Sequence, residues 1–405
     1  SMTKNMTSLA ILSLRDAGKL VLDAPLAEHV PQFAAVKPAT ADSKPVTLRD
    51  LMCHVAGFVT DDPWGDRVLG MTPAELDAVI ATGTLFARPP GLAFEYSNLG
   101  YALLGRVLTN VSDEPYQRYM RRTFLEALGM VHTTFDAPAA AHGDYAFGYR
   151  LDGAAWSRER LEPDGEVGAM GGLVTTAPDY ARWVAFLLSA WPPRDDAEAG
   201  PVRRASVREL ALYHAPPYRP ESGDPLPSAY GYGLVSSADA ELGRRLHHAG
   251  GLPGYGSHVL MLPDRGWGVF AFGNRTYAPM SKLTPRLAEI WHRAAPKPAP
   301  AAPSPALRRA IDAVIAAYAS GRIEDVADAC AVNLLLDTPP ALRNAQLADL
   351  KKRMGEVMTI AAIEPEHALA GDVVLTCEHG RLKVELVLSP EARPGIQKLV
   401  FIRIE

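Results

Sequence analysis

The chain has 405 residues, of which 48% are hydrophobic and 21% are charged, and its formal net charge is −5. A chain of this length and composition can bury the cores of two or more domains. The mild negative charge argues against a broad nucleic-acid-binding surface, and the apolar runs are far shorter than the roughly 20 residues that a membrane-spanning helix needs.

The amino-terminal segment contains the apolar run 9–14 and is expected to form a helix from about Ser1 to Ala17, ended by Gly18. Residues three apart share one face of a helix, so Ser1 and Lys4 can touch. A serine hydroxyl becomes nucleophilic when a neighbouring base removes its proton, and Lys4 can be that base if burial lowers its pKa. The alternative is an ordinary helix cap followed by a solvated lysine.

Further helices, separated by long polar loops, are expected from the spacing of apolar residues. Their expected bounds are 47–54, 73–82, 98–111, 114–128, 177–190 and 204–213. The loop before the third of these contains Tyr96-Ser97-Asn98. The Tyr96 phenol could accept the proton of Ser1, and the Asn98 amide could bond both Lys4 and a substrate carbonyl. Alternatively, Ser97 or Asn98 only caps the helix.

From about residue 230 the sequence becomes typical of strands. Segments 258–262 and 267–272 flank a Pro-Asp-Arg-Gly turn and predict an antiparallel hairpin, on which a helix at 283–294 should pack. Before them lies His248-Ala249-Gly250-Gly251, whose glycines would let a strand approach a ligand closely. His248 could line a pocket between the sheet and the helical lobe, and the Gly251 N–H could stabilise an oxyanion. The alternative is a glycine-rich turn with surface histidines.

Residues 296–305 are rich in proline and alanine and predict a semi-rigid linker. Residues 306–405 predict a small α+β domain that resembles nuclear-transport-factor-like or cystatin-like folds, and its role in packing, dimerisation or ligand binding stays open. Cys53 is expected to be a buried thiol, whereas Cys330 and Cys377 could form a disulfide or stay reduced. The expected helices of this domain are 307–318, 323–330 and 341–354, and its expected strands are 358–363, 373–377, 382–388 and 398–404.

Ser1-Met2-Thr3-Lys4, Tyr96-Ser97-Asn98 and His248-Ala249-Gly250 together resemble the three ordered sequence boxes of the serine β-lactamase-related superfamily. The resemblance covers residues 1 to about 295 and is to the branch of class C β-lactamases, D-alanyl-D-alanine carboxypeptidases and family VIII esterases. It implies an α/β (α+β) fold of the β-lactamase/transpeptidase type, with an antiparallel sheet flanked by helices and a mostly helical lobe. It implies that Ser1, Lys4, Tyr96 and His248 are catalytic residues. It also implies that the substrate is bound by Asn98, Gly250 and Gly251.

Members of this family carry roughly two strands and a helix before the first box, and nothing precedes Ser1 in this sequence. Two explanations are open: a shortened chain, or a serine added before a native Met2. Weak activity is expected in both cases, because Ser1 would carry a titrating α-amine in place of an amide oxyanion donor. Missing strands would leave a sheet edge unpaired and favour a homodimer. If an upstream export signal was lost, the protein is expected to be periplasmic or secreted. If there was no such signal, it is expected to be cytoplasmic.

These observations predict a serine hydrolase that cleaves a small ester, amide or β-lactam through a covalent acyl-enzyme on Ser1. No metal or other cofactor is expected, because the histidines and cysteines follow no metal-ligand spacing. Esterase or peptidase activity is favoured over strong β-lactamase activity, since His248 replaces the lysine that helps class C enzymes to bind the β-lactam carboxylate. The alternative is a non-catalytic binding or scaffold protein on the same fold.

Overall fold

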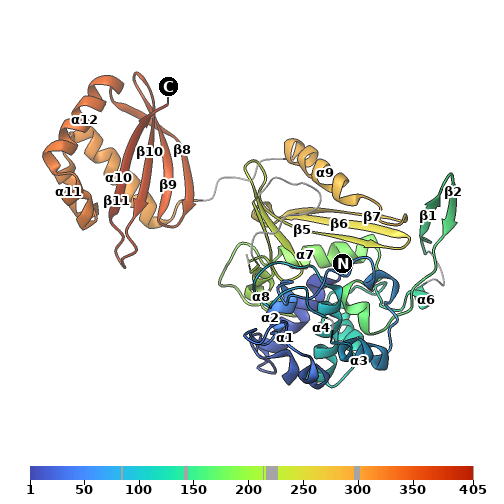
Figure 1. Cartoon of the computed structure of the whole chain (residues 1–405). Coiled ribbons are helices and arrows are strands. Elements are labelled where there is room, and N and C mark those ends of the chain that lie inside the picture. Colours follow the sequence, from blue (N-terminus) through green and yellow to red (C-terminus); the bar gives the residue numbers. More distant parts are fainter. Residues whose placement is uncertain (84, 141–144, 213, 216–226, 296–301, 405) are drawn as a thin grey trace. The chain divides into compact units, whose positions relative to one another are not determined.

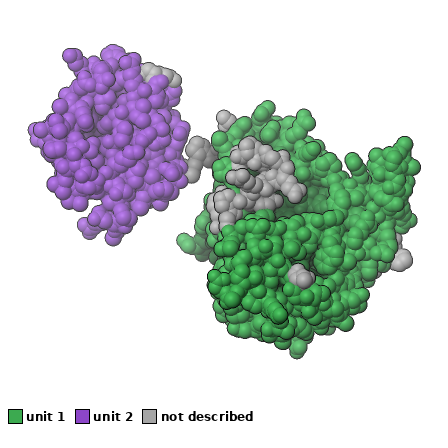
Figure 2. Space-filling view, viewed as in Figure 1, with its two compact units in different colours: residues 1–295 green, residues 296–405 purple. Residues whose placement is uncertain are grey.

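The computed structural model describes residues 1–83, 85–140, 145–212, 214–215, 227–295 and 302–404. The chain divides into two compact units, Ser1–Ala295 and Pro296–Glu405 (Figure 2). Each unit contains its own cluster of buried apolar side chains. Among the described residues, none of the helices combines the length and the apolar character that crossing a membrane requires.

The first unit is built on a five-stranded antiparallel sheet whose strands are neighbours in sequence order (Figure 1). The helix α9 (Met280–Ala294) packs on β6 and β7, and α7 (Ala177–Leu188) packs on the same two strands from the helical lobe. The predicted hairpin and its covering helix are confirmed. The strands are β3 (Ser228–Tyr230), β4 (Val235–Asp239), β5 (Gly243–Leu252), β6 (Tyr255–Leu262) and β7 (Trp267–Gly273).

The helical lobe surrounds α1 (Lys4–Asp16), which is buried on nearly all sides. A helix with buried residues all round belongs in a core, and its small polar side chains must therefore find partners. Thr7 Oγ1 donates to the carbonyl of Ala169 at 2.7 Å, and Ser8 Oγ lies 3.0 Å from the hydroxyl of Tyr101. This interior helix fixes the position of the residues at its amino end.

The other helices of the lobe follow the expected order, with local differences. The helix expected over 114–128 begins at Tyr116 and changes from α to π hydrogen bonding at Arg121. The lobe contains α2 (Leu48–Met52), α3 (Pro73–Ala81), α4 (Asn98–Ser112), α5 (Tyr116–Met120), the π-helix η4 (Arg121–Glu126), α6 (Ala137–Ala140) and α8 (Arg204–Glu209). Short 3₁₀ turns are η1 (Leu26–Glu28), η2 (Pro31–Ala35), η3 (Gly65–Arg67), η5 (Glu166–Met170) and η6 (Pro263–Arg265).

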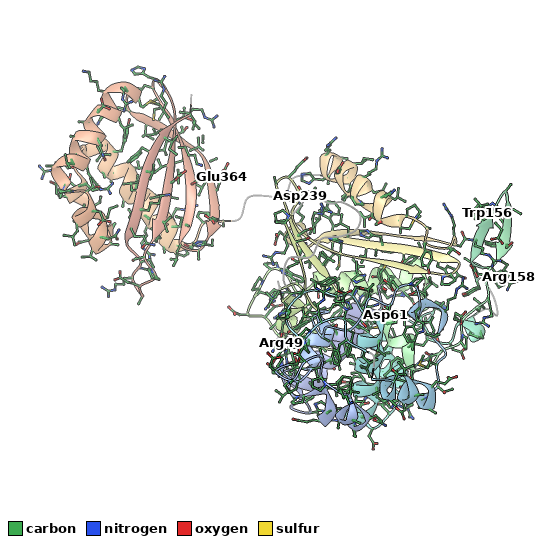
Figure 3. All side chains as sticks on the ribbon, viewed as in Figure 1. Arg49, Asp61, Trp156, Arg158, Asp239 and Glu364 are labelled. Carbon is green, nitrogen blue, oxygen red and sulfur yellow. The ribbon has the colours of Figure 1, made fainter. Side chains whose placement is uncertain are left out.

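A small hairpin of β1 (Tyr149–Asp152) and β2 (Ala155–Arg158) extends from this unit (Figure 1). Its residues are mostly exposed on both faces, although Tyr149-Arg150-Leu151-Asp152 alternates apolar and polar residues and Asp152-Gly153 is typical of a hairpin turn. Trp156 is 58% exposed, and the Arg158 guanidinium lies 3.4 Å from the ring centroid of Phe147 (Figure 3). This hairpin was not among the expected strands, because a four-residue alternation is too short to predict a strand by itself.

The second unit packs helices on one face of a four-stranded antiparallel sheet in the order β11-β10-β9-β8. Most of the expected linker, residues 296–301, lies outside the described residues, and its last residue, Pro305, already belongs to α10. The free thiols of Cys330 and Cys377 show that the disulfide alternative is wrong. The elements are α10 (Pro305–Ser320), η7 (Ile323–Ala329), α11 (Val332–Asp337), α12 (Pro340–Met354), β8 (Val357–His367), β9 (Ala370–Cys377), β10 (Gly380–Leu388) and β11 (Ile396–Arg403).

Candidate active site

Ser1 and Lys4 face each other across a single turn at the amino end of α1. The helix begins at Lys4 and not at Ser1 as expected, and the Lys4 N–H donates to the Ser1 carbonyl at 3.0 Å. This turn still gives the two residues helical spacing, and Lys4 Nζ lies 3.0 Å from Ser1 Oγ. Lys4 is fully buried, at 0% exposure.

Lys4 Nζ forms hydrogen bonds with three oxygen atoms, two of which can only accept, and it also lies 3.9 Å from Met170 Sδ. Nζ lies 2.7 Å from Asn98 Oδ1 and 2.8 Å from the carbonyl oxygen of Met170. A neutral amine has two hydrogens and one lone pair. With both hydrogens directed to these two oxygens, its lone pair is left for the hydroxyl of Ser1. The contacts accommodate an ammonium that donates to all three oxygens, and equally a neutral amine whose lone pair accepts the proton of Ser1.

The electrostatic environment of Lys4 favours partial loss of its charge. Burial lowers its pKa from 10.5 to about 8, because a buried ammonium loses its hydration. At pH 7 roughly one Lys4 side chain in ten is then a neutral amine. Three carboxylates stabilise the ammonium and limit the shift, namely Asp62, Asp61 and Asp66.

Tyr96 reaches the same serine from the loop before α4. Its Oη lies 2.8 Å from Ser1 Oγ, so the hydroxyl of Ser1 is shared between a phenol and an amine. Lys4 Nζ also lies 4.9 Å from the centroid of the Tyr96 ring, a distance typical of a cation–π contact. Three segments that are distant in the sequence therefore meet at one oxygen atom.

The acidic loop before η3 holds Asn98 in place. Asp61 accepts hydrogen bonds from the backbone N–H groups of Asn98 at 2.6 Å and Leu99 at 2.7 Å (Figure 3). A carboxylate at the first turn of α4 also interacts favourably with the helix dipole. The Asn98 Nδ2 donates to Asp62, which directs the amide oxygen towards Lys4. A Cβ on Gly65 would lie 2.8 Å from Asn98 Cβ, so this approach requires glycine.

His248 lies in the wall of this site, and both of its ring nitrogens already have partners. Nδ1 lies 2.5 Å from the carbonyl of Ala249, and Nε2 lies 2.8 Å from the hydroxyl of Tyr230. Burial, followed by the charge of Lys4, lowers the pKa of His248 well below its usual value. The sequence suggested that His248 assists deacylation. A neutral ring whose nitrogens are both engaged argues against that role and fits a wall residue.

The glycines after His248 bring β5 close to the amino terminus. β4 pairs with β5 only as far as His247, and beyond that point β5 pairs with β6 alone among the described strands. A Cβ on Gly250 would lie 2.3 Å from Ser257 Oγ and 3.6 Å from Met2 N, and one on Gly251 would lie 2.6 Å from a Tyr277 ring carbon. The part of β5 that no longer pairs with β4 therefore lies beside Met2, the residue that follows Ser1.

Several residues of the site carried no signal in the sequence. Asp61, Asp62 and Asp66 fall in a polar loop with proline and glycine, where acidic residues are common. Tyr277 donates to Asp66 at 2.9 Å and so connects the sheet side of the site to the helical lobe. The ring of His54 lies against that of Tyr96 in a tilted contact, whereas the sequence placed His54 at the end of the expected helix 47–54 and suggested no role for it in the site.

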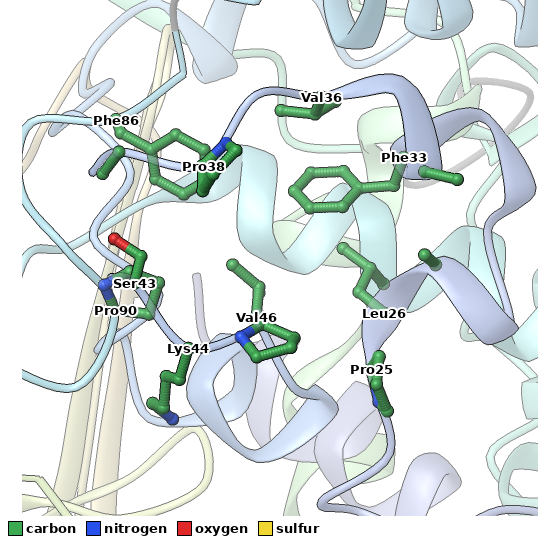
Figure 4. A pocket seen from close by; sticks show the side chains of 14 residues that line it. Pro25, Leu26, Phe33, Val36, Pro38, Ser43, Lys44, Val46, Phe86 and Pro90 are labelled. Atoms are coloured by element: carbon green, nitrogen blue, oxygen red, sulfur yellow. The ribbon is translucent and has the colours of Figure 1, made fainter. Parts of the chain in front are cut away.

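A separate apolar cavity of about 150 Å³ lies among η1, η2 and the loop around Phe86 (Figure 4). Lys44 is at its edge, with Nζ 2.7 Å and 2.8 Å from the two carboxylate oxygens of Asp50. Its remaining lining is mainly proline, alanine, valine and phenylalanine. None of the residues around Ser1 lines this cavity, so it is distinct from the candidate active site.

Several known proteins are similar to this chain. The Beta-lactamase family matches residues 1–290. "Protein flp" of Staphylococcus aureus (strain NCTC 8325 / PS 47) is 28% identical over 290 residues, which are 71% of this chain and 54% of that protein. D-alanyl-D-alanine-carboxypeptidase/endopeptidase AmpH of Escherichia coli (strain K12) is 28% identical over 286 residues, 68% of this chain and 70% of that protein. The chain thus spans about half the length of the first of these relatives.

Solved structures share the fold. The octameric penicillin-binding protein homologue from Pyrococcus abyssi has a TM-score of 0.59 and 20% identity, over 100% of this chain and 85% of that one. A β-lactamase/D-alanine carboxypeptidase from Yersinia pestis has a TM-score of 0.55 and 25% identity, over 72% of this chain and 82% of that one. The family match extends over most of the first unit. This chain belongs to the beta-lactamase family.

Proposed function

We propose that the protein is a serine hydrolase that cleaves a small ester or amide through an acyl-enzyme on Ser1. The observation that carries this proposal is the position of Ser1 Oγ, 3.0 Å from Lys4 Nζ and 2.8 Å from Tyr96 Oη. A nucleophile within hydrogen-bond reach of its base, with that base oriented by a third group, is the general signature of covalent catalysis. Asn98 and the Met170 carbonyl provide that orientation.

In the acylation step, the Oγ–H bond of Ser1 breaks and its proton moves to the neutral amine of Lys4. Oγ bonds to the substrate carbonyl carbon, and the carbonyl oxygen becomes an oxyanion. When the carbonyl re-forms, the bond to the leaving alcohol or amine breaks. The Tyr96 phenol gives the leaving atom a proton and regains one from the Lys4 ammonium. A water molecule then attacks the acyl-enzyme in the same way and restores Ser1.

The oxyanion needs hydrogen-bond donors that are in place before the reaction. The part of β5 beyond its pairing with β4 offers backbone N–H groups, and we assign the Gly251 N–H as one of these donors. Gly250 keeps this strand free of side-chain bulk on the face near Met2 and Ser257. Asn98 donates one Nδ2 hydrogen to Asp62 and accepts from Lys4 through its amide oxygen, which leaves its second Nδ2 hydrogen for a substrate carbonyl.

The substrate preference follows from the low pKa of His248. A neutral imidazole supplies no charge for the carboxylate of a β-lactam, whereas uncharged esters and amides do not need one. We therefore propose esterase or peptidase activity over strong β-lactamase activity. The similarity to the D-alanyl-D-alanine-carboxypeptidase/endopeptidase AmpH supports an amide as the natural bond.

Mass spectrometry of the full chain after incubation with p-nitrophenyl butyrate, and separately with benzylpenicillin, tests the proposal. We expect an acyl adduct on the peptide that contains Ser1, formed faster from the ester. Ser1→Ala should reduce acylation at least about 1000-fold. Ser320→Ala, at the exposed end of α10, is the matched control and should acylate like the unchanged chain. An unmodified Ser1 peptide with both reagents would instead support a non-catalytic binding protein.

A further inference from the structure

His54 is a buried histidine in an unusual backbone conformation, directly behind the tyrosine of the site. It follows α2 with a φ of 58°, in the left-handed region that favours glycine and asparagine. It is 2% exposed, and its Nε2 has no hydrogen-bond partner among the described residues. Left-handed backbone and an unpartnered buried N–H both cost free energy, so stability alone does not explain a histidine here.

His54 contacts the chain on both sides of Tyr96. The backbone N–H of Glu95 donates to the carbonyl oxygen of His54 at 2.8 Å. The backbone N–H of Ser97 donates to Nδ1 of the ring at 3.1 Å. His54 therefore accepts two hydrogen bonds, one from the residue before Tyr96 and one from the residue after it. These two bonds fix the backbone from which the phenol projects.

The ring of His54 also supports the Tyr96 ring itself. The two ring centroids are 4.2 Å apart with an interplanar angle of 33°, which is a close, tilted ring contact. The histidine ring is enclosed by three further aromatic rings, with centroids 4.7 Å, 5.2 Å and 5.6 Å away. It cannot rotate without displacing them, and these rings belong to Tyr230, Tyr101 and Phe94.

The protonation state of His54 is set by the same contacts. Nδ1 accepts the hydrogen bond from Ser97, so the ring proton is on Nε2 and the ring is neutral. Burial, followed by the charge of Lys4, lowers the pKa of His54 well below its usual value. The ring thus keeps its acceptor at Nδ1 at every pH at which the site would work.

We propose that His54 is a positioning residue that holds the Tyr96 phenol against Ser1 Oγ, through two hydrogen bonds to the neighbouring backbone and a close ring contact. This inference rests on the proposed function, because it gives His54 a role only if Tyr96 handles the proton of Ser1. His54 does not touch Ser1 in any described contact. Its effect on the reaction must therefore pass through Tyr96, and a double-mutant cycle can test that route.

The first variant is His54→Asn, which adopts left-handed backbone readily and places an acceptor near the position of Nδ1, but has no ring to lie against that of Tyr96. The second is His54→Ala, which removes both the acceptor and the ring. Displacement of a reacting group by about 1 Å can lower a rate on the order of 100-fold. We expect His54→Ala to lower kcat for the p-nitrophenyl ester by about 100-fold and His54→Asn by about tenfold, with KM within about twofold.

The matched control is His258→Asn. His258 is also buried, at 4% exposure, but it lies on β6 and contacts Thr284 of α9. Its replacement should lower the thermal midpoint and leave kcat within about twofold. The decisive comparison uses Tyr96→Phe, which keeps the ring for this contact and removes the hydroxyl. In that background His54→Asn should change kcat by less than about twofold, because the group that it positions is absent.

An equal loss in both backgrounds would overturn the proposal, because His54 would then act on the fold as a whole. Unchanged kcat and pH profile in a folded His54→Asn variant would also overturn it. The unchanged chain separates this inference from the proposed function. If that chain forms no adduct at Ser1, the proposed function fails, and with it the role of His54. If it forms the adduct and the cycle shows no coupling, only the role of His54 fails.

Discussion

The pKa of Lys4 makes a quantitative prediction for the rate of acylation. With a pKa of about 8, the neutral amine is roughly one-tenth of the population at pH 7 and nine-tenths at pH 9. If Lys4 is the base, the acylation rate should rise about tenfold over this interval and then level off. A lysine with the ordinary pKa of 10.5 would give a rate that still rises steeply at pH 9.

Asp62→Asn changes this profile in a defined direction. Among the carboxylates that stabilise the Lys4 ammonium, Asp62 acts most strongly, and asparagine can still accept the hydrogen bond from Asn98. Loss of the negative charge should lower the pKa of Lys4 and increase the neutral fraction at pH 7. Acylation at pH 7 should then accelerate by between about two- and tenfold, the upper limit being complete neutralisation. The plateau above pH 9 should not change.

The assay is the pre-steady-state burst of p-nitrophenol between pH 5.5 and 9.5. Asp349→Asn, on α12 of the second unit, is the control and should retain the profile of the unchanged chain. A flat profile between pH 7 and 9 would refute Lys4 as the base. A midpoint that moves upward in Asp62→Asn would refute the electrostatic reasoning, since removal of an anion cannot stabilise an ammonium.

Two further variants probe the same site. Asn98→Asp places a carboxylate where the amide oxygen now lies 2.7 Å from Lys4 Nζ, and this negative charge should raise the pKa of Lys4. The pH midpoint of the burst should therefore rise above 8, and the rate at pH 7 should fall about tenfold. An unchanged midpoint would contradict this reasoning. Gly251→Ala places a Cβ 2.6 Å from a ring carbon of Tyr277 and should lower the free energy of unfolding in urea by about 1–3 kcal/mol. Gly100→Ala is the control: its Cβ would lie 3.7 Å from the nearest atom, so the free energy of unfolding should stay the same or increase. Equal urea midpoints for Gly251→Ala and Gly100→Ala would show that β5 can move to make room for the added Cβ.

The sequence predicted the parts of the fold that depend on local periodicity. The fold class, the hairpin of β6 and β7 and the long helices are confirmed because apolar spacing and turn residues specify them locally. The contact of Ser1 with Lys4 was also predictable, since it needs only one turn of spacing. The strands β3 and β4 were missed because they are short and lack a clear apolar alternation.

The rest of the site depends on tertiary contacts that no local pattern specifies. His54, Asp61 and Tyr277 look ordinary in the sequence, and each gains its place from a partner far away along the chain. The role expected for His248 depended on the direction of its ring. That direction is set by the hydroxyl of Tyr230 on β3, a strand that the sequence did not reveal.

The two separate hydrophobic cores affect how any of these variants should be measured. No residue that the structure describes belongs to both cores, so heat need not unfold the chain in a single step. A calorimetric scan should resolve into two transitions, and covalent loading of Ser1 by a slow acylating agent should move only the one that belongs to residues 1–295. A thermogram therefore contains its own reference: the transition of residues 306–405 reports the buffer and the heating rate, while that of residues 1–295 reports occupancy of Ser1.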